Sequence, residues 1–331
     1  MKIGILGAGS IAATVVPAMV GPAERYAVAS RTLEKARHFA EEFGFCKAYG
    51  SYEEMLLDPA VELVYVATPH SHHYAHMKLA LEHGKHVLCE KAFTENAAQA
   101  RAIRDLAGEK GLYAAEAIWT RYMPSRRIIN DVLASGMIGV PNTLTANLSY
   151  PISQVPRIRR PELAGGALLD IGVYGLNFAL MHFGWDIARI GSAVELTDTG
   201  VDGMETITLF YKDGRMAVLT HSIYARSDRK GIIHGDKGYL VVENINNPRS
   251  VDVYDVQDRL TAHYDVPPQI NGYEYEFQEA LRAIEAGKLQ SDSMPLEESI
   301  HVMELMDSLR RDWGIVYPDE TGKDCHERAS D

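Results

Sequence analysis

The stretch that decides the fold is KIGILGAGSIAA, residues 2–13. Its first residues are apolar and β-favouring and predict a short strand, and a helical pattern follows over Ile11–Val20. Between them, Gly7, Gly9 and Ala12 match the pattern G-x-G-x-x-G/A. The first position permits a tight turn, the second lets a pyrophosphate approach the backbone, and the small third residue lets the helix pack on the strand. A strand, this turn and a helix in that order predict a dinucleotide-binding Rossmann domain.

The phosphates of such a cofactor would bind at the start of this helix. Its first N–H groups, at Ser10 and Ile11, have no partner inside the helix, and the helix dipole is positive there. The choice of dinucleotide depends on the end of the second strand, where an acidic residue would bind the ribose hydroxyls of NAD. The chain has Ser30 and Arg31 there, and a hydroxyl and a guanidinium suit the 2′-phosphate of NADP. We expect NADP rather than NAD, the alternative being that Arg31 stacks on the adenine or faces solvent.

Length and charge limit what else the chain does. Its 331 residues exceed one typical core, so we expect two domains. A formal net charge of -12 disfavours a nucleic-acid partner, because phosphate binding needs clustered Lys and Arg. The uncharged stretch Ile3–Ala23 is broken by glycines and a proline, so we interpret it as strand, turn and helix and not as a signal peptide or membrane span. Cys46, Cys89 and Cys325 form no C-x-x-C pair, and a reducing cytoplasm fits them best.

The first 122 residues alternate short β-favouring runs with longer helical patterns, which is typical of βαβ units in a doubly wound parallel sheet. The expected strands are Lys2–Leu6, Tyr26–Ser30, Leu63–Ala67, His86–Cys89 and Tyr113–Ala115. The expected helices are Ile11–Val20, Leu33–Phe43, His72–His83 and Glu95–Gly108. We therefore place an α/β Rossmann dinucleotide-binding domain at residues 1–122.

Residues 123–331 have the pattern of an α+β domain, which we expect to bind the substrate. The expected helices are Ser125–Ser135, Ala167–Phe183, Tyr273–Ala286 and Leu296–Trp313. The expected strands are Thr143–Tyr150, Thr206–Tyr211, Ala217–Ile223 and Tyr239–Glu243, with turn signals between them such as Asp202–Gly203. Alternation of apolar and polar residues in these strands predicts a largely antiparallel open sheet with one face available for packing.

A group of histidines follows Thr68, which ends a strand at the carboxyl edge of the sheet, where doubly wound folds bind ligands. His70, His72, His73 and His76 include a helical i, i+4 pair, a spacing that metal sites also use. No carboxylate or cysteine accompanies them, and hydride transfer with a nicotinamide needs no metal. We expect no metal site, and we place these histidines along the nicotinamide side of the cleft or in solvent.

Three residues are candidates for the chemistry. Hydride transfer from an alcohol carbon needs a group that takes or gives the hydroxyl proton. Lys91 ends the fifth strand, and Tyr174 lies four residues after Asp170 on one predicted helix. An ammonium beside a phenol favours the phenolate, so Lys91 and Tyr174 can exchange a proton near neutral pH if both reach one oxygen, with Asp170 holding Lys91 or contacting the substrate. The alternative is that Lys91 and Glu90 form a solvated pair and Asp170 bonds to Tyr174 for structural reasons.

Several motifs along the chain point to one family. They are Gly7–Ala12, Ala29–Arg31, Thr68-Pro69 with His73, Gly84–Lys91, Trp119–Arg121 and Gly165–Tyr174. Together they resemble the glucose-fructose oxidoreductase and inositol dehydrogenase family over nearly the whole chain. Within that family the chain is similar to the branch that contains dimeric dihydrodiol dehydrogenase and NADP-dependent xylose 1-dehydrogenase, because Tyr174 stands where many members have a histidine.

The resemblance implies that Lys91 and Tyr174 are the acid/base pair, with Asp170 beside them and Trp119 and Arg121 near the substrate pocket. It implies a sugar, cyclic polyol or trans-dihydrodiol as substrate and a homodimer that pairs the open faces of the C-terminal sheets. On the cofactor side we place Thr68, His73, Glu90 and Lys91 together with the glycine turn.

One position departs from the family pattern. Members usually have Glu-Lys-Pro, with a proline that is commonly cis, and this chain has Ala92 after Lys91. A cis bond before a residue other than proline costs about 3 kcal/mol, so we expect a trans bond with a local backbone adjustment. The reach of Lys91 depends on that adjustment.

The leading hypothesis is an NADP-dependent dehydrogenase or reductase that acts on a CH–OH group. The alternatives are a lyase or glycosidase that uses a bound nicotinamide transiently, and a catalytically silent NADP-binding regulator. The sequence leaves open which substrate is used and in which direction the reaction runs. It also leaves two roles open for Arg157, Arg159 and Arg160, which either bind an anionic group or form a solvated basic loop.

Overall fold

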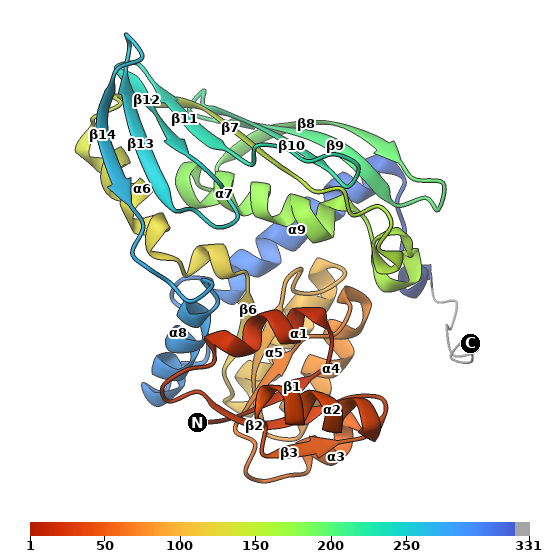
Figure 1. The fold of residues 1–331 in the computed structure, drawn as a ribbon. Helices are drawn as coiled ribbons and strands as arrows, with labels where there is room; N and C mark the ends of the chain where they lie inside the picture. Colours follow the sequence, from red (N-terminus) through yellow and green to blue (C-terminus); the bar gives the residue numbers. More distant parts are fainter. Residues whose placement is uncertain (322–331) are drawn as a thin grey trace. The chain divides into compact units, whose positions relative to one another are not determined.

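The computed structural model describes residues 1–321 as two compact units (Figure 1). The first unit is formed by Met1–Tyr122 with Gln269–Glu304, and the second by Met123–Pro268 with the residues from Leu305 onward. Cys325, one of the cysteines on which the expected location rests, lies outside the described residues.

Residues 269–304 were assigned to the second domain by the sequence analysis, and in the structure they pack with the first unit. Phe277 lies against Tyr65 of the first unit, with 5.2 Å between ring centroids, and both side chains are buried. The predicted domain boundary assumed that each domain is one continuous segment. Local periodicity does not show whether a later segment packs with an earlier domain.

The first unit is built on a six-stranded parallel sheet. Its strands are β1 (Lys2–Leu6), β2 (Glu24–Ala29), β3 (Lys47–Tyr49), β4 (Leu63–Val66), β5 (His86–Glu90) and β6 (Ala114–Ala117). They are hydrogen-bonded in the order β3-β2-β1-β4-β5-β6, and every pair is parallel. All four residues of β4 are fully buried, as expected for a strand covered on both faces. The predicted Rossmann sheet is confirmed.

Three helices of the first unit begin at short polar side chains. They are α1 (Ser10–Val15), α2 (Leu33–Phe43), α3 (Tyr52–Leu56), α4 (His70–Glu82), α5 (Ala97–Lys110) and α8 (Glu274–Glu285). Thr32, Ser51 and Asn96 each accept a hydrogen bond from the N–H three residues on, at the starts of α2, α3 and α5. α1 ends before the predicted Val20, because Pro17 has no N–H for a helical bond and the chain tightens into a 3₁₀ turn, Val16–Ala18. The sequence analysis missed β3 and α3, which are too short for a periodic pattern.

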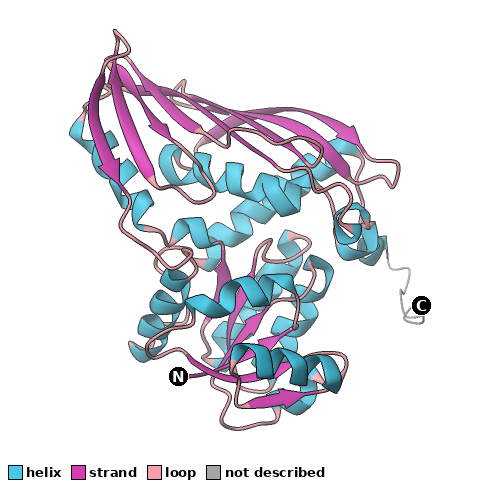
Figure 2. Ribbon diagram, in the orientation of Figure 1, coloured by secondary structure: helices cyan, strands magenta, loops and turns pink. Residues whose placement is uncertain are grey.

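The second unit is an eight-stranded sheet with helices on one face (Figure 2). Its strands are β7 (Pro141–Ser149), β8 (Ile187–Leu196), β9 (Asp202–Tyr211), β10 (Met216–Ser222), β11 (Gly231–Gly235), β12 (Gly238–Val242), β13 (Ser250–Asp255) and β14 (Leu260–Asp265). Their order is β14-β13-β12-β11-β7-β10-β9-β8; β7 and β10 are parallel and the other neighbours are antiparallel. This confirms the predicted largely antiparallel sheet. α6 (Pro124–Ser135) packs on β13, α7 (Val173–Phe183) packs on β7 and β10, and α9 (Leu296–Trp313) contributes residues to both units.

The helix predicted at 167–183 is not a single α-helix. It opens with a π-helical turn, η5 (Leu168–Gly172), and continues as α7. The segment Pro161–Phe183 is long and apolar enough to cross a membrane by composition, but 94% of its apolar window is buried inside the described structure, as in a core helix. Asp202 was predicted in a turn, and it instead begins β9 and is fully buried. At Asp202 the buried strand therefore overrides the local turn signal.

A half-buried carboxylate joins two strands of the first unit to the loop before β4. Asp58 accepts hydrogen bonds from Tyr26 OH (3.1 Å), Lys47 Nζ (2.7 Å), Tyr49 OH (2.6 Å) and the N–H of Ala60 (2.9 Å). Burial by itself would raise the pKa of this carboxyl, but the donors favour the charged form more strongly and hold the pKa of Asp58 well below its ordinary value. The charge of Asp58 therefore stabilises this edge of the sheet.

We predict that Asp58→Asn lowers the free energy of unfolding by about 1–2 kcal/mol at pH 7, because the amide cannot accept from every donor. A group with a depressed pKa stabilises the fold above its unfolded pKa and loses that effect as the pH falls through the folded pKa. The advantage of wild type over the variant should thus shrink below about pH 4. Urea unfolding at several pH values measures it, with Asp105→Asn at an exposed site as the control. An advantage that stays constant in acid contradicts the account.

Candidate active site

The glycine turn after β1 lies between the ends of two neighbouring strands. Gly7 has a φ of +103°, which L side chains rarely adopt. Its N–H donates to the O of Ala29 at the end of β2 (3.0 Å), and a Cβ on Gly7 would lie 2.8 Å from the O of Ala67, just after β4. Glycine is therefore required at position 7 by both backbone angle and space, as the pattern predicted.

The space in front of Gly9 is open. A Cβ added there would meet nothing within 4 Å. Gly9 is the N-cap of α1 and offers no side chain to its first N–H groups, and Ser10 beside it is exposed. The strand order reverses between β1 and β4, so the turn lies at the switch point where doubly wound sheets bind dinucleotides. Open space in front of uncapped N–H groups fits a pyrophosphate, so these residues fit the predicted cofactor.

Ser30 and Arg31 differ in exposure. Ser30 is buried, and its N–H donates to the O of Tyr49 at 3.2 Å. Arg31 is exposed in the short loop between β2 and α2. Its charge reaches Tyr52, where burial raises the pKa of the phenol and Arg31 acts against that rise. An exposed guanidinium at the end of the second strand is where a 2′-phosphate would be recognised.

His73, on α4, links two loops at the carboxyl edge of the sheet. It is fully buried, and its ring nitrogens lie 2.8 Å from the O of Ala92 and 2.8 Å from the O of Thr68. His76 Nδ1 lies 2.9 Å from Thr68 Oγ1. In the part of the chain that the structure describes, no group of three or more His, Cys, Asp or Glu is arranged to hold a metal. His73 fastens the loops after β4 and β5 to each other, and His76 bonds to the first of them.

Lys91 follows β5 at the same edge of the sheet. The Lys91–Ala92 peptide bond is cis, so the expected trans bond is wrong. Tertiary contacts outweigh the local preference for a trans bond at this position. Ala92 is fully buried and its carbonyl O bonds to His73, and the N–H of Phe93 donates to Glu116 Oε1 (3.2 Å). Burial raises the pKa of Glu116 to about 7, and the positive charge of Lys91 acts against that rise. Lys91 thus lies close to a buried carboxyl.

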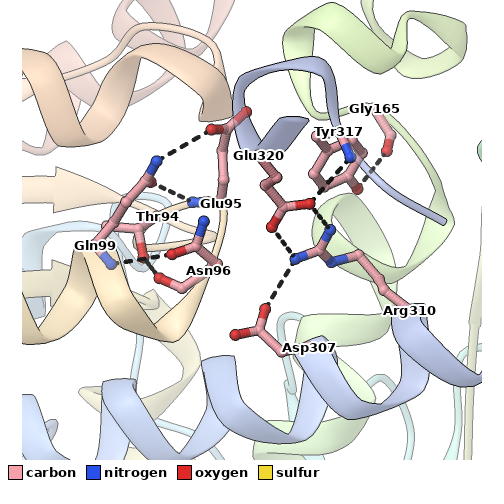
Figure 3. Close-up of polar contacts among 9 residues, drawn as sticks. All are labelled: Thr94, Glu95, Asn96, Gln99, Gly165, Asp307, Arg310, Tyr317 and Glu320. Carbon is pink, nitrogen blue, oxygen red and sulfur yellow. Dashed lines mark hydrogen bonds and ion pairs between the residues drawn. The ribbon is translucent and has the colours of Figure 1, made fainter. Parts of the chain in front are cut away.

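The loop after this turn is closed by side-chain to backbone hydrogen bonds (Figure 3). Thr94 Oγ1 donates to the O of Asn96 (2.8 Å), and Asn96 accepts from the N–H of Gln99 (3.0 Å). The N–H of Glu95 donates to Gln99 Oε1 (3.1 Å). The loop is therefore held to the first turn of α5.

Glu90 belongs to a buried polar cluster that the sequence analysis missed. Tyr65 OH donates to Glu90 Oε1 (2.5 Å) and lies 3.2 Å from Glu276 Oε1. Burial and the nearby charge of Glu90 raise the pKa of Glu276 well above its ordinary value. The available signal was a glutamate among the apolar positions of α8, beside Phe277. Glu90 is thus a buried group and not half of a solvated pair.

Trp119 and Arg121 lie in the interior of the first unit. The Trp119 ring stacks on Tyr273, with 4.3 Å between centroids and 9° between planes. Arg121 is 2% exposed and forms an ion pair with Glu298. Both partners come from the segment that returns to the first unit late in the chain, so no spacing near Trp119 could have identified them.

Asp170 and Tyr174 lie in the second unit, at η5 and the start of α7. Both are buried, and Arg157 donates to Asp170 Oδ1 at 3.0 Å. The other two arginines of the loop also have carboxylate partners: Arg159 pairs with Asp198 and Arg160 with Glu162. The loop is therefore a set of ion pairs, and Arg157 is the member that contacts a predicted site residue.

The predicted residues form two groups, one in each unit. In the first unit, the turns after β1, β2, β4 and β5, together with α1, α4 and the end of β5, carry Gly7, Gly9, Ser10, Ile11, Ala12, Ser30, Arg31, Thr68, His73, Glu90 and Lys91. The turn after β6 carries Trp119 and Arg121. In the second unit, η5 and α7 carry Asp170 and Tyr174. The first group has the features of a dinucleotide site, and the second supplies a carboxylate and a phenol.

Similar proteins include oxidoreductases that match this chain over nearly its whole length. The trans-1,2-dihydrobenzene-1,2-diol dehydrogenase of Mus musculus is 32% identical over 335 residues, covering 97% of this chain and 99% of that one. The D-xylose 1-dehydrogenase (NADP(+)) of Hypocrea jecorina is 33% identical and covers 100% and 96%. A solved structure of KijD10, a 3-ketoreductase from Actinomadura kijaniata in complex with NADP and TDP-benzene, is similar with a TM-score of 0.86 and 28% identity, covering 94% and 97%.

Family models match both halves of the fold. Residues 1–117 match the oxidoreductase family with an NAD-binding Rossmann fold, GFO/IDH/MocA, and residues 127–241 match the GFO/IDH/MocA C-terminal domain. These matches and the full-length relatives bear out the resemblance drawn from the motifs. The chain belongs to the GFO/IDH/MocA family of oxidoreductases.

Proposed function

We propose that the chain is an NADP-dependent oxidoreductase that moves a hydride to or from a hydroxyl-bearing carbon of a sugar or trans-dihydrodiol. The observation that carries the proposal is the glycine turn at the switch point of the sheet, where Gly7 is sterically required and Gly9 opens onto free space. Lys91 lies two strands away at the same edge, after β5. The relatives named for dihydrodiol, xylose and NADP support the substrate class and the cofactor.

In this proposal the protein's own residues move the proton while a bound nicotinamide supplies the hydride acceptor or donor. Tyr174 takes the proton from the substrate hydroxyl during oxidation and returns it during reduction. The ammonium of Lys91 stabilises negative charge on the same oxygen and on the phenolate. Asp170, paired with Arg157, orients the substrate hydroxyl or Lys91. The roles of Trp119 and Arg121 near the substrate stay a prediction.

The glycine turn gives a test with an internal control. We expect Gly9→Ala to fold like wild type and to bind NADPH at least about 10-fold more weakly, because its methyl group fills the space a pyrophosphate needs. Gly7→Ala should instead lower the thermal midpoint, since its φ of +103° and the O of Ala67 exclude a side chain. Cofactor fluorescence titrated with NADPH and NADH, beside thermal melts, measures both effects. Wild-type affinity in Gly9→Ala would argue against this site.

A second prediction tests the acid/base pair. Lys91→Met and Tyr174→Phe should each lower kcat for oxidation of trans-1,2-dihydrobenzene-1,2-diol or D-xylose by about 10²–10⁴-fold, the usual effect of removing a proton-transfer group. The Kd of NADPH should stay within a few-fold for Tyr174→Phe. Tyr275→Phe removes a phenol hydroxyl from α8 that has no part in the proposed proton transfer, and it serves as the control. Equal kcat in Tyr174→Phe and wild type would remove Tyr174 from the mechanism.

The homodimer and the cytoplasmic location are part of the same proposal. Large apolar side chains are exposed on the strands of the second unit: Leu196 on β8, Met204 on β9, and Leu260 and Tyr264 on β14. Exposed apolar side chains on an open sheet support pairing of two sheets. Light scattering on the eluting protein should give twice the mass of the chain, and Met204→Asp should shift it toward the monomer. A monomer at micromolar concentration would contradict the dimer.

A further inference from the structure

We propose that Asp202, Glu205 and His221 form a positioning cluster that sets the backbone of the segment carrying Asp170 and Tyr174. The inference rests on the proposed function, since it assigns these buried groups a role in aligning the proposed acid/base site. It concerns contacts within the second unit alone.

The cluster is built across two strands. Glu205 on β9 and His221 on β10 are directly opposite each other in the antiparallel register, and His221 Nδ1 lies 2.9 Å from Glu205 Oε1. Both side chains have 0% exposure. Asp202, the first residue of β9, is also fully buried. Glu205 and His221 therefore occupy inward positions that the alternation of the strands reserves for apolar residues, and Asp202 is buried beside them where the register of β8 and β9 shifts.

Within residues 1–321, which the structure describes, no Lys or Arg forms an ion pair with Asp202 or Glu205. Among the residues the structure describes, buried atoms without a hydrogen-bond partner include Asp202 Oδ1, Glu205 Oε2 and His221 Nε2. Burial raises the pKa of Asp202 well above its ordinary value and that of Glu205 to about 8, and burial lowers the pKa of His221 to about 3. The nearby charge of Glu205 adds to the rise in the pKa of Asp202, so the two carboxyls lie close together. Such groups are expensive to bury, and a core would not hold three of them without a use.

The cluster lies against three glycines of the segment that carries Asp170 and Tyr174. A Cβ on Gly166 would approach Asp202, one on Gly172 would approach Glu205, and one on Gly175 would approach His221, each at under 3.0 Å. Asp202 also accepts a hydrogen bond from the N–H of Leu168, the first residue of η5. These contacts hold the backbone of the segment against the sheet at several successive points.

The proposed site residues lie between these points of contact. Asp170 stands between Leu168 and Gly172, and Tyr174 stands between Gly172 and Gly175. The segment changes from π-helix to α-helix at Gly172, so its register is sensitive to what lies beneath it. A displacement of about 1 Å in a catalytic group can cost about 100-fold in rate, so contacts that fix this backbone bear directly on catalysis.

The start of the segment is held from a second direction (Figure 3). Tyr317 OH donates to the O of Gly165 at 2.9 Å, and Arg310 lies over the Tyr317 ring, 4.5 Å from its centroid. Glu320 accepts two hydrogen bonds from the Arg310 guanidinium, at 2.8 and 2.9 Å. The turn before η5 is thus fixed independently, so a change in the cluster acts on the segment from Gly166 onward without releasing its start.

The first experiment compares Glu205→Ala with Glu205→Gln. Glu205→Ala should lower kcat for NADP-linked oxidation of D-xylose or trans-1,2-dihydrobenzene-1,2-diol by about 10–100-fold, leave the Kd of NADPH within twofold, and raise the primary isotope effect with D-xylose deuterated at carbon 1. Glu205→Gln keeps the volume and one hydrogen bond and should recover most of the rate. A kcat equal to wild type in Glu205→Ala, or the same loss in both variants, would overturn the proposal.

The second experiment approaches the contact from the helix. Gly175→Ala adds one methyl group against His221 and should lower kcat as Glu205→Ala does, without removing any buried polar group. Gly108→Ala is the matched control, since Gly108 is a helical glycine of α5 whose added Cβ would meet nothing within 4 Å. Equal activity in Gly175→Ala and Gly108→Ala would overturn the proposal.

Amide hydrogen exchange separates this inference from the proposed function. Glu205→Ala and Gly175→Ala should speed exchange in residues 168–175, and Gly108→Ala should not. If the wild-type chain oxidises neither D-xylose nor the diol, the proposed function fails, and the exchange result still decides whether the cluster sets this backbone. Unchanged exchange at 168–175 in both variants would overturn the inference whatever the activity.

Discussion

The carboxyl edge of the parallel sheet depends on the absence of a side chain at Gly7. Its N–H bonds to the end of β2, and its α-carbon lies so close to the O of Ala67 that no Cβ fits. These two contacts hold the turn after β1 against the ends of both neighbouring strands. They place the start of α1 at the switch point of the sheet. Gly9, two residues on, has the opposite property, since its surroundings are empty. One glycine is required by the fold, and the other keeps room for a ligand.

The same edge is organised by buried polar groups more than by apolar contact. His73 joins the loops after β4 and β5 through two backbone carbonyls, and Glu116 holds the N–H of Phe93 just after Lys91. Backbone groups in these loops cannot pair within the sheet, so side chains from behind the loops satisfy them. The position of Lys91 therefore depends on His73 and Glu116, which bond to the backbone just after it. A buried cluster in the second unit, Asp202 with Glu205 and His221, stands in the same relation to Asp170 and Tyr174.

Buried carboxyls recur in both units. Glu276 shares Tyr65 with Glu90, and Asp202 faces Glu205, and in each pair burial favours the protonated form. Replacing such groups by apolar side chains of similar size commonly leaves stability unchanged or raises it. We attribute the presence of these costly buried groups to the backbone geometry that they impose on a neighbouring turn or helix. This is the shared physical feature of the two groups of site residues.

The sequence by itself determined the parallel sheet, the glycine turn, the end of β5 at Lys91 and the family. Each of these depends on short patterns, because residues close together in the chain share one local backbone conformation. It also indicated Asp170 and Tyr174, since they lie on one helical segment. Only the tertiary structure decided the rest: that Gln269–Glu304 returns to the first unit, that Lys91–Ala92 is cis, and that Glu205 and His221 lie beneath the helix. These features depend on contacts between residues far apart in the chain, and a local pattern carries no information about which distant side chain will fill a given space.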